Sequence, residues 1–192
     1  MNVREAIKSR RSIRKFLQTP INHTILTDLV DTARLCASGA NLQPLKYAVL
    51  DNRDIVQAIF PLVKWAGYLP DWNPAPMEGP PAYIAVFGDT TISSAFETDA
   101  GAAVTTMMLA AVELGLATCW LGAIDRPALQ SLLGFDDRLR LLYLLAVGYP
   151  DQESVIRPIA EGNCKYYFDS QGILQVPKRP LADILLSLPK KA

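Results

Sequence analysis

Apolar positions along the chain follow two patterns, one with the spacing of helices and one with the continuous runs of buried strands. Helical spacing, together with capping residues and turn signals, predicts helices at residues 2–9, 22–33, 52–60, 94–115, 126–133 and 181–188. Largely apolar runs rich in β-branched and aromatic residues predict buried strands at 45–50, 82–88, 116–122 and 141–150. The 94–115 helix is apolar on nearly every side, so we expect it to be central and buried.

Capping residues mark where two of these helices begin. Asn2 is expected to cap the first helix, and either Asn22 or Thr24 the second. The only histidine, His23, lies at this second start, where we expect a capping or surface role. Taken together, the elements predict an α/β arrangement, with helices on both sides of a small sheet, in one domain over residues 1–192.

Residues 61–81 fit neither pattern. They hold six prolines and the aromatic residues Trp65, Tyr68 and Trp72. Proline removes donors from helices and sheets, so we expect this stretch to be irregular or only partly helical. It is either a mobile lid over a binding site or a segment whose aromatic side chains hold the fold or a dimer surface together.

Composition and charge exclude several classes of protein. Lys and Arg number 19 and Asp and Glu also 19, so no net field favours nucleic acid or an anionic membrane. The three cysteines show no C-x-x-C spacing, which argues against a disulfide framework, a zinc site or an iron–sulfur cluster, and Cys119 is expected to be a small core residue. With no signal-peptide pattern and no apolar run of roughly 20 residues, we expect a cytoplasmic protein.

A basic segment near the start is the first candidate for binding chemistry. Arg10, Arg11, Ser12 and Arg14 place three guanidinium groups and a hydroxyl within five residues, and 10 and 14 would share a face if the helix continued. Such a set suits a dianionic phosphate, because each guanidinium can donate two parallel hydrogen bonds. The alternative is a solvated basic face. The chain has neither a G-x-G-x-x-G nor a G-x-x-x-x-G-K-S/T loop, which excludes those two phosphate cradles.

A polar loop at 38–44 is the second candidate. Asn41 and Gln43 each offer an amide donor and a carbonyl acceptor, a pairing that suits the pyrimidine edge of a flavin. The alternative is a helix C-cap followed by a turn. Residues 97–103 at the head of the long helix are acidic and then small, which the helix dipole and close helix packing explain.

Two further segments complete the candidates. The small Gly122-Ala123 pair after Trp120 would let the backbone approach a planar ligand, where an amide could meet a flavin N5. Lys178 and Arg179 form a second cationic pair, which by itself is typical of a protein surface.

In this order and at these separations, the segments resemble the nitroreductase family of flavoproteins. The matching stretches are R-R-S-I-R-K-F, A-S-G-A-N-L-Q-P, D-A-G-A-A-V, G-L-A-T-C-W-L-G and K-R-P-L, which together span nearly the whole chain. The resemblance implies an α+β homodimer with a mixed sheet flanked by helices and with FMN bound at the subunit interface. It favours binding roles for the basic segment and the 38–44 loop over the alternatives above.

The resemblance also implies roles for individual residues. Arg10, Arg11, Ser12 and Arg14 would hold the phosphate and ribityl chain, with Lys178 or Arg179 near the phosphate. Ser38, Gly39 and Asn41, and more weakly Gln43, would reach the flavin from the partner subunit, and Trp120, Gly122 and Ala123 would line its ring near N5. Many members have proline where Ala37 stands and an acidic residue where Gly122 stands, so the contact at Gly122 would be through the backbone.

The activity that the resemblance implies is electron transfer from NADH or NADPH through FMN to nitroaromatics, quinones or other small planar acceptors, by a ping-pong mechanism. The redox chemistry belongs to the cofactor, so no catalytic side chain is expected. Two alternatives stay open: a specialised member (a dehalogenase, an ene-reductase or a ring dehydrogenase), or a flavin-binding protein with little turnover. Neither the donor preference nor the physiological acceptor follows from the sequence.

Overall fold

The structure is a computed structural model, which describes residues 1–188. Its α-helices are α1 (Val3–Ser9), α2 (His23–Arg34), α3 (Arg53–Ile59), α4 (Glu97–Glu113), α5 (Arg126–Leu133) and α6 (Leu181–Ile184), with short 3₁₀ helices η1 (Gly39–Asn41), η2 (Phe60–Leu62) and η3 (Pro76–Glu78). The strands are β1 (Leu45–Leu50), β2 (Ala82–Asp89), β3 (Ala117–Leu121), β4 (Leu139–Gly148), β5 (Ser154–Pro158), β6 (Tyr167–Phe168) and β7 (Leu174–Lys178).

The four predicted strands form one sheet in the order β1-β2-β4-β3, and each neighbouring pair is antiparallel. The α/β arrangement expected from the apolar pattern is therefore wrong, and the α+β fold that the resemblance implied is confirmed. Apolar runs reveal strands but not their direction, which depends on contacts between distant segments. Mixed pairing occurs in the small sheet β5-β7-β6, where β5 and β7 are parallel and β6 and β7 antiparallel.

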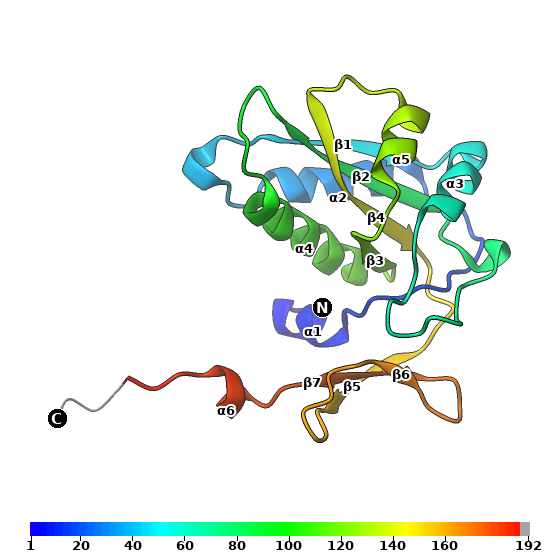
Figure 1. Ribbon diagram of the computed structural model, residues 1–192, viewed down its shortest axis with the longest axis vertical. Helices are drawn as coiled ribbons and strands as arrows, with labels where there is room; N and C mark the ends of the chain where they lie inside the picture. Colours follow the sequence, from blue (N-terminus) through cyan, green and yellow to red (C-terminus); the bar gives the residue numbers. More distant parts are fainter. Residues whose placement is uncertain (189–192) are drawn as a thin grey trace.

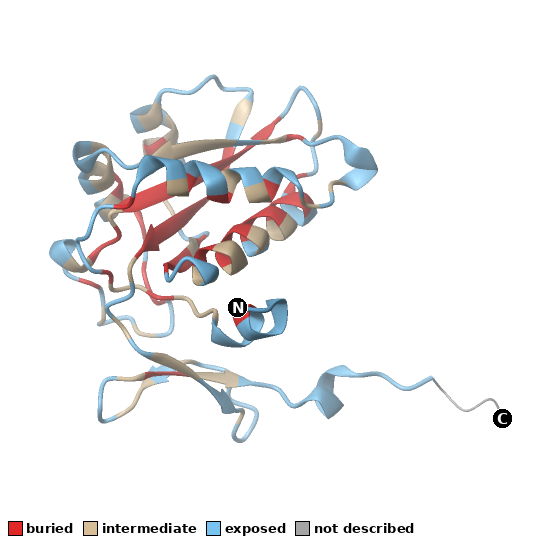
Figure 2. Cartoon of the chain, turned by 180° about the vertical axis from the view of Figure 1, so that it is seen from behind, coloured by how far each residue is buried: buried red, intermediate tan, exposed pale blue. Residues whose placement is uncertain are grey.

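Helices cover both faces of the main sheet (Figure 1). Side chains of β2 alternate between the faces, so Tyr83 and Phe87 join one apolar cluster with α3 and α5, whereas Ile84 joins another with α2 and α4. Strands β2 and β4 are central and buried, whereas β1 was expected to be buried but lies at the sheet edge and is only partly covered. The sequence thus places a double-sided core around β2 and β4 (Figure 2).

The helix starts confirm the capping expectations. Asn2 and Glu5 form a reciprocal capping box at α1, and the Asn22 side chain accepts a hydrogen bond from the Thr24 amide at α2. Helix α4 is central and buried as expected, but it begins at Glu97 rather than at 94. His23 is the first residue of α2 and is exposed, with Nδ1 2.7 Å from Asp51 Oδ2, which confirms its surface role.

After α1 the basic segment is extended instead of helical. Ile13 donates its amide hydrogen to the Thr118 carbonyl at 3.0 Å, and Ser12 forms a parallel bridge with Thr118, so the segment runs beside the edge strand β3. The expectation that 10 and 14 share a helical face is therefore wrong. In an extended segment, side chains alternate between the two sides, so positions 10, 12 and 14 lie on one side and position 11 lies on the other.

The C-terminal part differs most from the sequence expectation. The small sheet β5-β7-β6 was not predicted, and helix α6 ends at Ile184 rather than at 188. Residues 179–188, which follow β7, extend away from the main sheet (Figure 1). The side chains at 181, 184, 185, 186 and 188, all Leu or Ile, are each more than 60% exposed.

The proline-rich stretch 61–81 is irregular, as predicted, apart from the short helices η2 and η3. Trp65 is buried in the core, and Tyr68 and Trp72 pack on the C-terminal part of the chain. The ring centroid of Tyr68 lies 5.1 Å from that of Tyr166, and the centroid of Trp72 lies 5.3 Å from that of Phe168. These contacts tie the stretch to the segment that carries the small sheet. Among residues 1–188, none of the helices has the length and apolarity that crossing a membrane requires.

Candidate functional site

The basic segment is a cationic strip with no acidic partner. Among residues 1–188 no salt bridge includes Arg10, Arg11 or Arg14. Arg14 is nevertheless held in place, because its amide donates to Gln152 Oε1 at 2.9 Å and its guanidinium carbon lies 4.8 Å from the centroid of the Tyr166 ring. The segment therefore offers fixed positive charge to an anion from outside the chain.

Arg11 has different surroundings from its neighbours. Its guanidinium donates to the backbone carbonyls of Lys8 and Arg10, which closes the end of helix α1. Burial, and then the adjacent Arg10 charge, lower the pKa of Arg11 below its usual value. A bound anion would raise the pKa of Arg11 again, because it supplies a negative charge that residues 1–188 do not provide at this position.

Buried polar atoms without partners lie next to this strip. Within the described residues, Thr118 Oγ1, Trp120 Nε1 and Gln152 Nε2 are buried and make no hydrogen bond. Thr118 pairs with Ser12, and Gln152 holds the Arg14 amide, so two of these atoms belong to residues in direct contact with the basic segment. Unsatisfied buried groups are costly, and their concentration here fits a polar ligand that would complete them. Gln152 and Tyr166 were not identified from the sequence, since no local motif marks either residue.

The second candidate, the 38–44 loop, lies at the N-terminal end of helix α4. Ser38 Oγ donates to Asp99 Oδ2 at 2.5 Å, and the Gly39 amide donates to Asp99 Oδ1 at 3.0 Å. Ser38 Oγ also accepts from the Gln43 amide at 2.9 Å. Asp99 had been explained by the helix dipole and packing alone, but its buried carboxylate also holds this loop.

The loop backbone is strained. Ala40, Asn41 and Gln43 all have φ near +50°, in the left-handed region that residues other than glycine rarely adopt. The Gln43 side chain donates to both the backbone oxygen and the side-chain oxygen of Asn41, each at 3.1 Å. Such a conformation persists only where surrounding contacts impose it, and Asp99 supplies two of these contacts.

The third candidate follows β3. The ring of Trp120 meets Tyr143 edge-on with 5.1 Å between centroids, and its tip lies 4.0 Å from where a Cβ on Gly101 would be. Gly122 and Ala123 are exposed, and their carbonyls accept hydrogen bonds from Arg126 at 3.1 Å and from the Lys64 amide at 2.9 Å. The backbone at this point is thus fixed and open to a ligand.

A single chain does not unite all the predicted residues. It brings the basic segment beside β3. Among residues 1–188, however, no hydrogen bond or salt bridge joins the basic segment or β3 to the 38–44 loop, and none joins them to the exposed side chains of Lys178 and Arg179. Lys178 is the last residue of β7 in the C-terminal sheet. The 38–44 loop lies at the N-terminal end of α4, whereas β3 begins shortly after the C-terminal end of α4 (Figure 1). The predicted site is therefore present as separate parts.

Cys119 has no role in these parts. It is buried in β3, and burial raises the pKa of its thiol above the usual value. A protonated, enclosed thiol is a poor nucleophile, which agrees with the expected core role.

Comparisons with known proteins add to this geometry. The nitroreductase family model matches residues 7–149. A relative from Archaeoglobus fulgidus, with the provisional name NADH dehydrogenase/NAD(P)H nitroreductase, is 28% identical over 155 residues, which cover 77% of this chain and 84% of the relative. An iodotyrosine deiodinase from Nematostella vectensis is 24% identical over 180 residues, covering 79% of this chain and 68% of the relative. The solved structure of a provisionally named nitroreductase from Desulfovibrio desulfuricans in complex with FMN matches with a TM-score of 0.73 and 27% identity, over 100% of this chain and 99% of that one.

Proposed function

The chain belongs to the nitroreductase family, and from this premise we propose that it is an FMN-dependent oxidoreductase that transfers electrons from NADH or NADPH to small planar acceptors. Nitroaromatics and quinones are the acceptor classes we favour. The observation that carries the proposal is the cationic strip 10–14, which has no acidic partner among residues 1–188 and borders buried, unpaired polar atoms on β3. Relatives named for NAD(P)H-dependent reduction, and a neighbour that holds FMN, support it.

The residues present fit FMN. Arg10, Ser12 and Arg14 would hold the phosphate, with Lys178 or Arg179 from the C-terminal sheet, and Arg11 would add charge from the α1 side. The unpaired atoms Thr118 Oγ1 and Gln152 Nε2 would form hydrogen bonds with the phosphate or the ribityl chain of FMN. Ser38, Gly39, Asn41 and Gln43 would contact the ring edge, while Trp120, Gly122 and Ala123 would line its face.

The protein contributes position and charge to the reaction. When bound, FMN supplies the hydride chemistry at N5, and fixed guanidinium groups favour its anionic reduced form. We propose that donor and acceptor enter the same opening in turn, as in a ping-pong mechanism. The backbone beside Gly122 and Ala123 would keep this opening narrow enough to favour flat molecules.

We further propose that the protein works as a homodimer with two shared sites. Loop 38–44 and the basic segment lie apart in one chain, so a second copy would have to bring its loop to the strip. The exposed apolar side chains at 181–188 support this arrangement, because a contiguous exposed apolar stretch is typical of an interface.

A stopped-flow experiment tests the proposed function. Purified protein should be yellow and release FMN on denaturation. Under anaerobic conditions NADH or NADPH should bleach the flavin absorbance rapidly, and nitroaromatic or quinone acceptors should restore it. Bound flavin that neither nicotinamide reduces would instead indicate a flavin-binding protein, and reduction with turnover only on a halogenated aromatic would favour the dehalogenase alternative suggested by the deiodinase relative.

The contacts of Trp72 favour a structural role for the 61–81 stretch. Trp72 is half-buried against Phe168, and Lys15 Nζ lies 5.9 Å from the centroid of its ring. We expect Trp72→Ala to lower the free energy of unfolding by about 1–3 kcal/mol, somewhat less than for a fully buried aromatic. Turnover and KM for several acceptors should stay within about twofold of wild type. Unchanged thermal stability combined with large KM changes would restore the lid hypothesis.

A further inference from the structure

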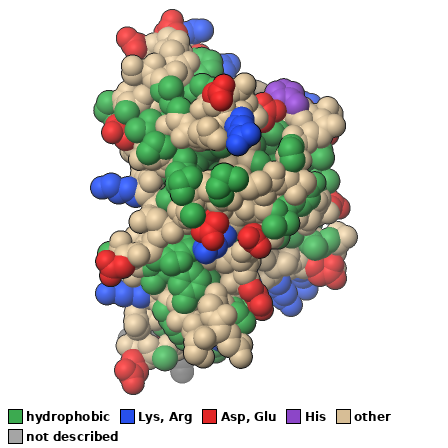
Figure 3. All heavy atoms as spheres, turned by 90° about the vertical axis from the view of Figure 1, so that its right-hand side faces the viewer, with side chains coloured by type: hydrophobic (Ala, Val, Ile, Leu, Met, Phe, Trp, Pro, Cys, Tyr) green, Lys and Arg blue, Asp and Glu red, His purple; other side chains and the backbone are tan. Residues whose placement is uncertain are grey.

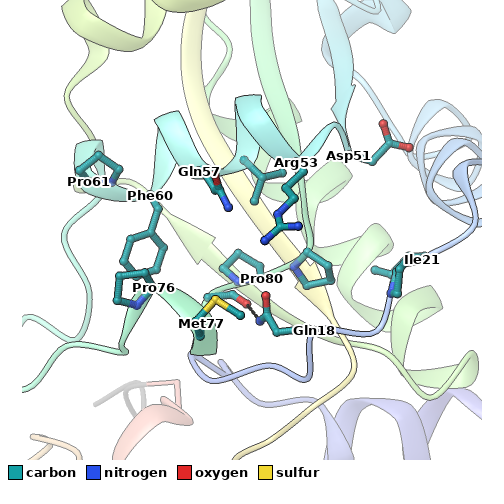
Figure 4. A pocket seen from close by; sticks show the side chains of 14 residues that line it. Gln18, Ile21, Asp51, Arg53, Gln57, Phe60, Pro61, Pro76, Met77 and Pro80 are labelled. Atoms are coloured by element: carbon teal, nitrogen blue, oxygen red, sulfur yellow. Dashed lines mark hydrogen bonds between the residues drawn. The ribbon is translucent and has the colours of Figure 1, made fainter.

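A second hollow in the molecule shares no residue with the proposed flavin site. It is a cavity of about 770 Å³ between helix α3, residues 76–81 and the extended segment 18–21 (Figure 4). This volume lies within the range of pockets that hold small organic molecules. Hydrophobic side chains gather on the corresponding face of the molecule, the face that also carries the histidine, with charged groups scattered around them (Figure 3). The hollow is therefore a candidate binding site in its own right.

The floor of this cavity is fixed by close packing. A Cβ atom on Gly79 would lie only 2.7 Å from Phe60 Cε2, so the glycine is what allows the aromatic ring to approach the backbone this closely. Gln18 Nε2 donates to the Gly79 carbonyl at 2.8 Å and closes the same floor. Pro81 is held similarly, because a Cβ on Gly148 would lie 2.8 Å from Pro81 Cδ. The floor is thus formed before any ligand arrives, which reduces the cost of binding.

The wall formed by η3 is also anchored. Glu78 accepts a hydrogen bond from the Ala75 amide at 2.8 Å, and its other oxygen pairs with Lys15 Nζ at 2.8 Å. Helix α3 on the opposite side is capped by Asn52, whose side chain accepts hydrogen bonds from the Asp54 and Ile55 amides. Both walls are therefore held by contacts that lie outside the cavity.

The cavity is lined by one cationic side chain, Arg53, and one carboxylate, Asp51. Figure 4 shows the Arg53 guanidinium reaching in beside the Gln57 amide and above the prolines. No salt bridge within the described residues includes Arg53. The Asp51 carboxylate points away from the other side chains in this view and pairs with His23. An apolar cavity with one free guanidinium is complementary to an apolar molecule with one negative charge.

We propose that this cavity binds a small, flat, largely apolar molecule that carries a single carboxylate. Arg53 binds the carboxylate through two parallel hydrogen bonds, and Gln57 can donate a third. The ring of the ligand lies against Phe60 and the flat faces of Pro76 and Pro80, with Met77 adapting to its outline. A nucleotide does not fit this chemistry, since one cation cannot balance several phosphate charges.

Calorimetry with 2-naphthoate as the probe tests the proposal, using purified protein saturated with FMN so that any flavin site is filled. We expect Arg53→Gln to weaken probe binding by at least about tenfold, because a charged hydrogen-bonding partner is lost. Met77→Asp, at an exposed position, should weaken it as well by repelling the carboxylate. Arg138→Gln removes an exposed arginine elsewhere and should leave the affinity unchanged. The neutral 2-naphthamide should bind wild type and Arg53→Gln equally weakly.

Three results would overturn the proposal. Equal affinity of wild type and Arg53→Gln for 2-naphthoate would mean that Arg53 does not bind the carboxylate. A change in flavin absorbance on probe binding, with no effect of Arg53→Gln, would place the probe over the flavin. Absence of probe binding together with a shift toward monomer for Met77→Asp in sedimentation velocity would mean that the cavity receives part of a second copy. If the protein fails to bind FMN, the same titrations are run on protein without FMN, because the cavity and the proposed flavin site share no residues.

Discussion

Replacing Arg14 with alanine should weaken FMN binding by about 1.5–3 kcal/mol, or roughly 10- to 150-fold in Kd. Arg14 is fixed by the Gln152 contact to its amide and by the Tyr166 ring beneath its guanidinium, so little freedom is lost when an anion binds. Arg10→Ala should cause a loss of the same size. Ser12, between them, bridges to Thr118 and keeps both arginines on one side of the extended segment.

The measurement is a titration of flavin-free protein with FMN, followed by quenching of flavin fluorescence. Arg140→Ala is the matched control, because Arg140 is an exposed arginine whose contact is Glu97 at 3.3 Å. Its removal should change FMN affinity little, since exposed ion pairs contribute at most about 1 kcal/mol. Riboflavin, which has no phosphate, should bind wild type and Arg14→Ala with similar affinity. Wild-type affinity for FMN in both Arg10→Ala and Arg14→Ala would remove the phosphate assignment.

Much of the fold could be predicted because its signals are local. Asn2 and Glu5 form their capping box within one turn, and residues 82–88 of β2 and 141–148 of β4 are apolar runs whose burial needs no knowledge of their neighbours. Strand direction could not be predicted in this way, because it depends on pairings such as Leu45 with Gly88. The small sheet was missed for a similar reason: β5 is short, largely exposed and ends in proline, and it becomes a strand only through pairing with β7.

The C-terminal helix shows how periodicity can overextend an element. Leucines at 181, 185 and 188 have helical spacing, yet the helix ends at Ile184. A helix this short gains little from intrinsic propensity and needs a packed face to persist. In a single copy of the chain these leucines are exposed, so the packing contact that the pattern implies would have to come from outside residues 1–188.

The candidate site was predicted only as far as its motifs reach. The arginines and the loop amides are close in sequence and chemically distinctive, whereas Gln152, Tyr166 and Asp99 act on segments far from them along the chain. Asp99 lies 61 residues after Ser38 and contacts it directly. The helix dipole and helix packing are sufficient to explain an acidic residue at this position, so nothing in the sequence indicated that Asp99 also holds the 38–44 loop.

That second role leads to the other large effect we expect. Asp99→Ala should weaken FMN binding by about 1–3 kcal/mol, although Asp99 belongs to the loop and not to the phosphate strip. Without the carboxylate, Ser38 and Gly39 lose their acceptor, and the left-handed conformations at Ala40, Asn41 and Gln43 lose the contacts that impose them. The loop then becomes less ordered in the protein without FMN. Part of the free energy of FMN binding must compensate for ordering it again, so the measured affinity falls.

Glu97→Ala separates this effect from charge at the helix start. Glu97 and Asp99 share the first turn of α4, so both interact with the helix dipole, but only Asp99 has hydrogen bonds to the loop. FMN affinity should stay close to wild type in Glu97→Ala and fall in Asp99→Ala. FMN affinity should also fall in Ser38→Ala. The double variant with Asp99→Ala should lose less affinity than the sum of the two single variants, because Ser38 and Asp99 share one hydrogen bond. If Asp99→Ala behaves like Glu97→Ala, the carboxylate acts only on the helix, and the strained loop must be held in place by its own side chains.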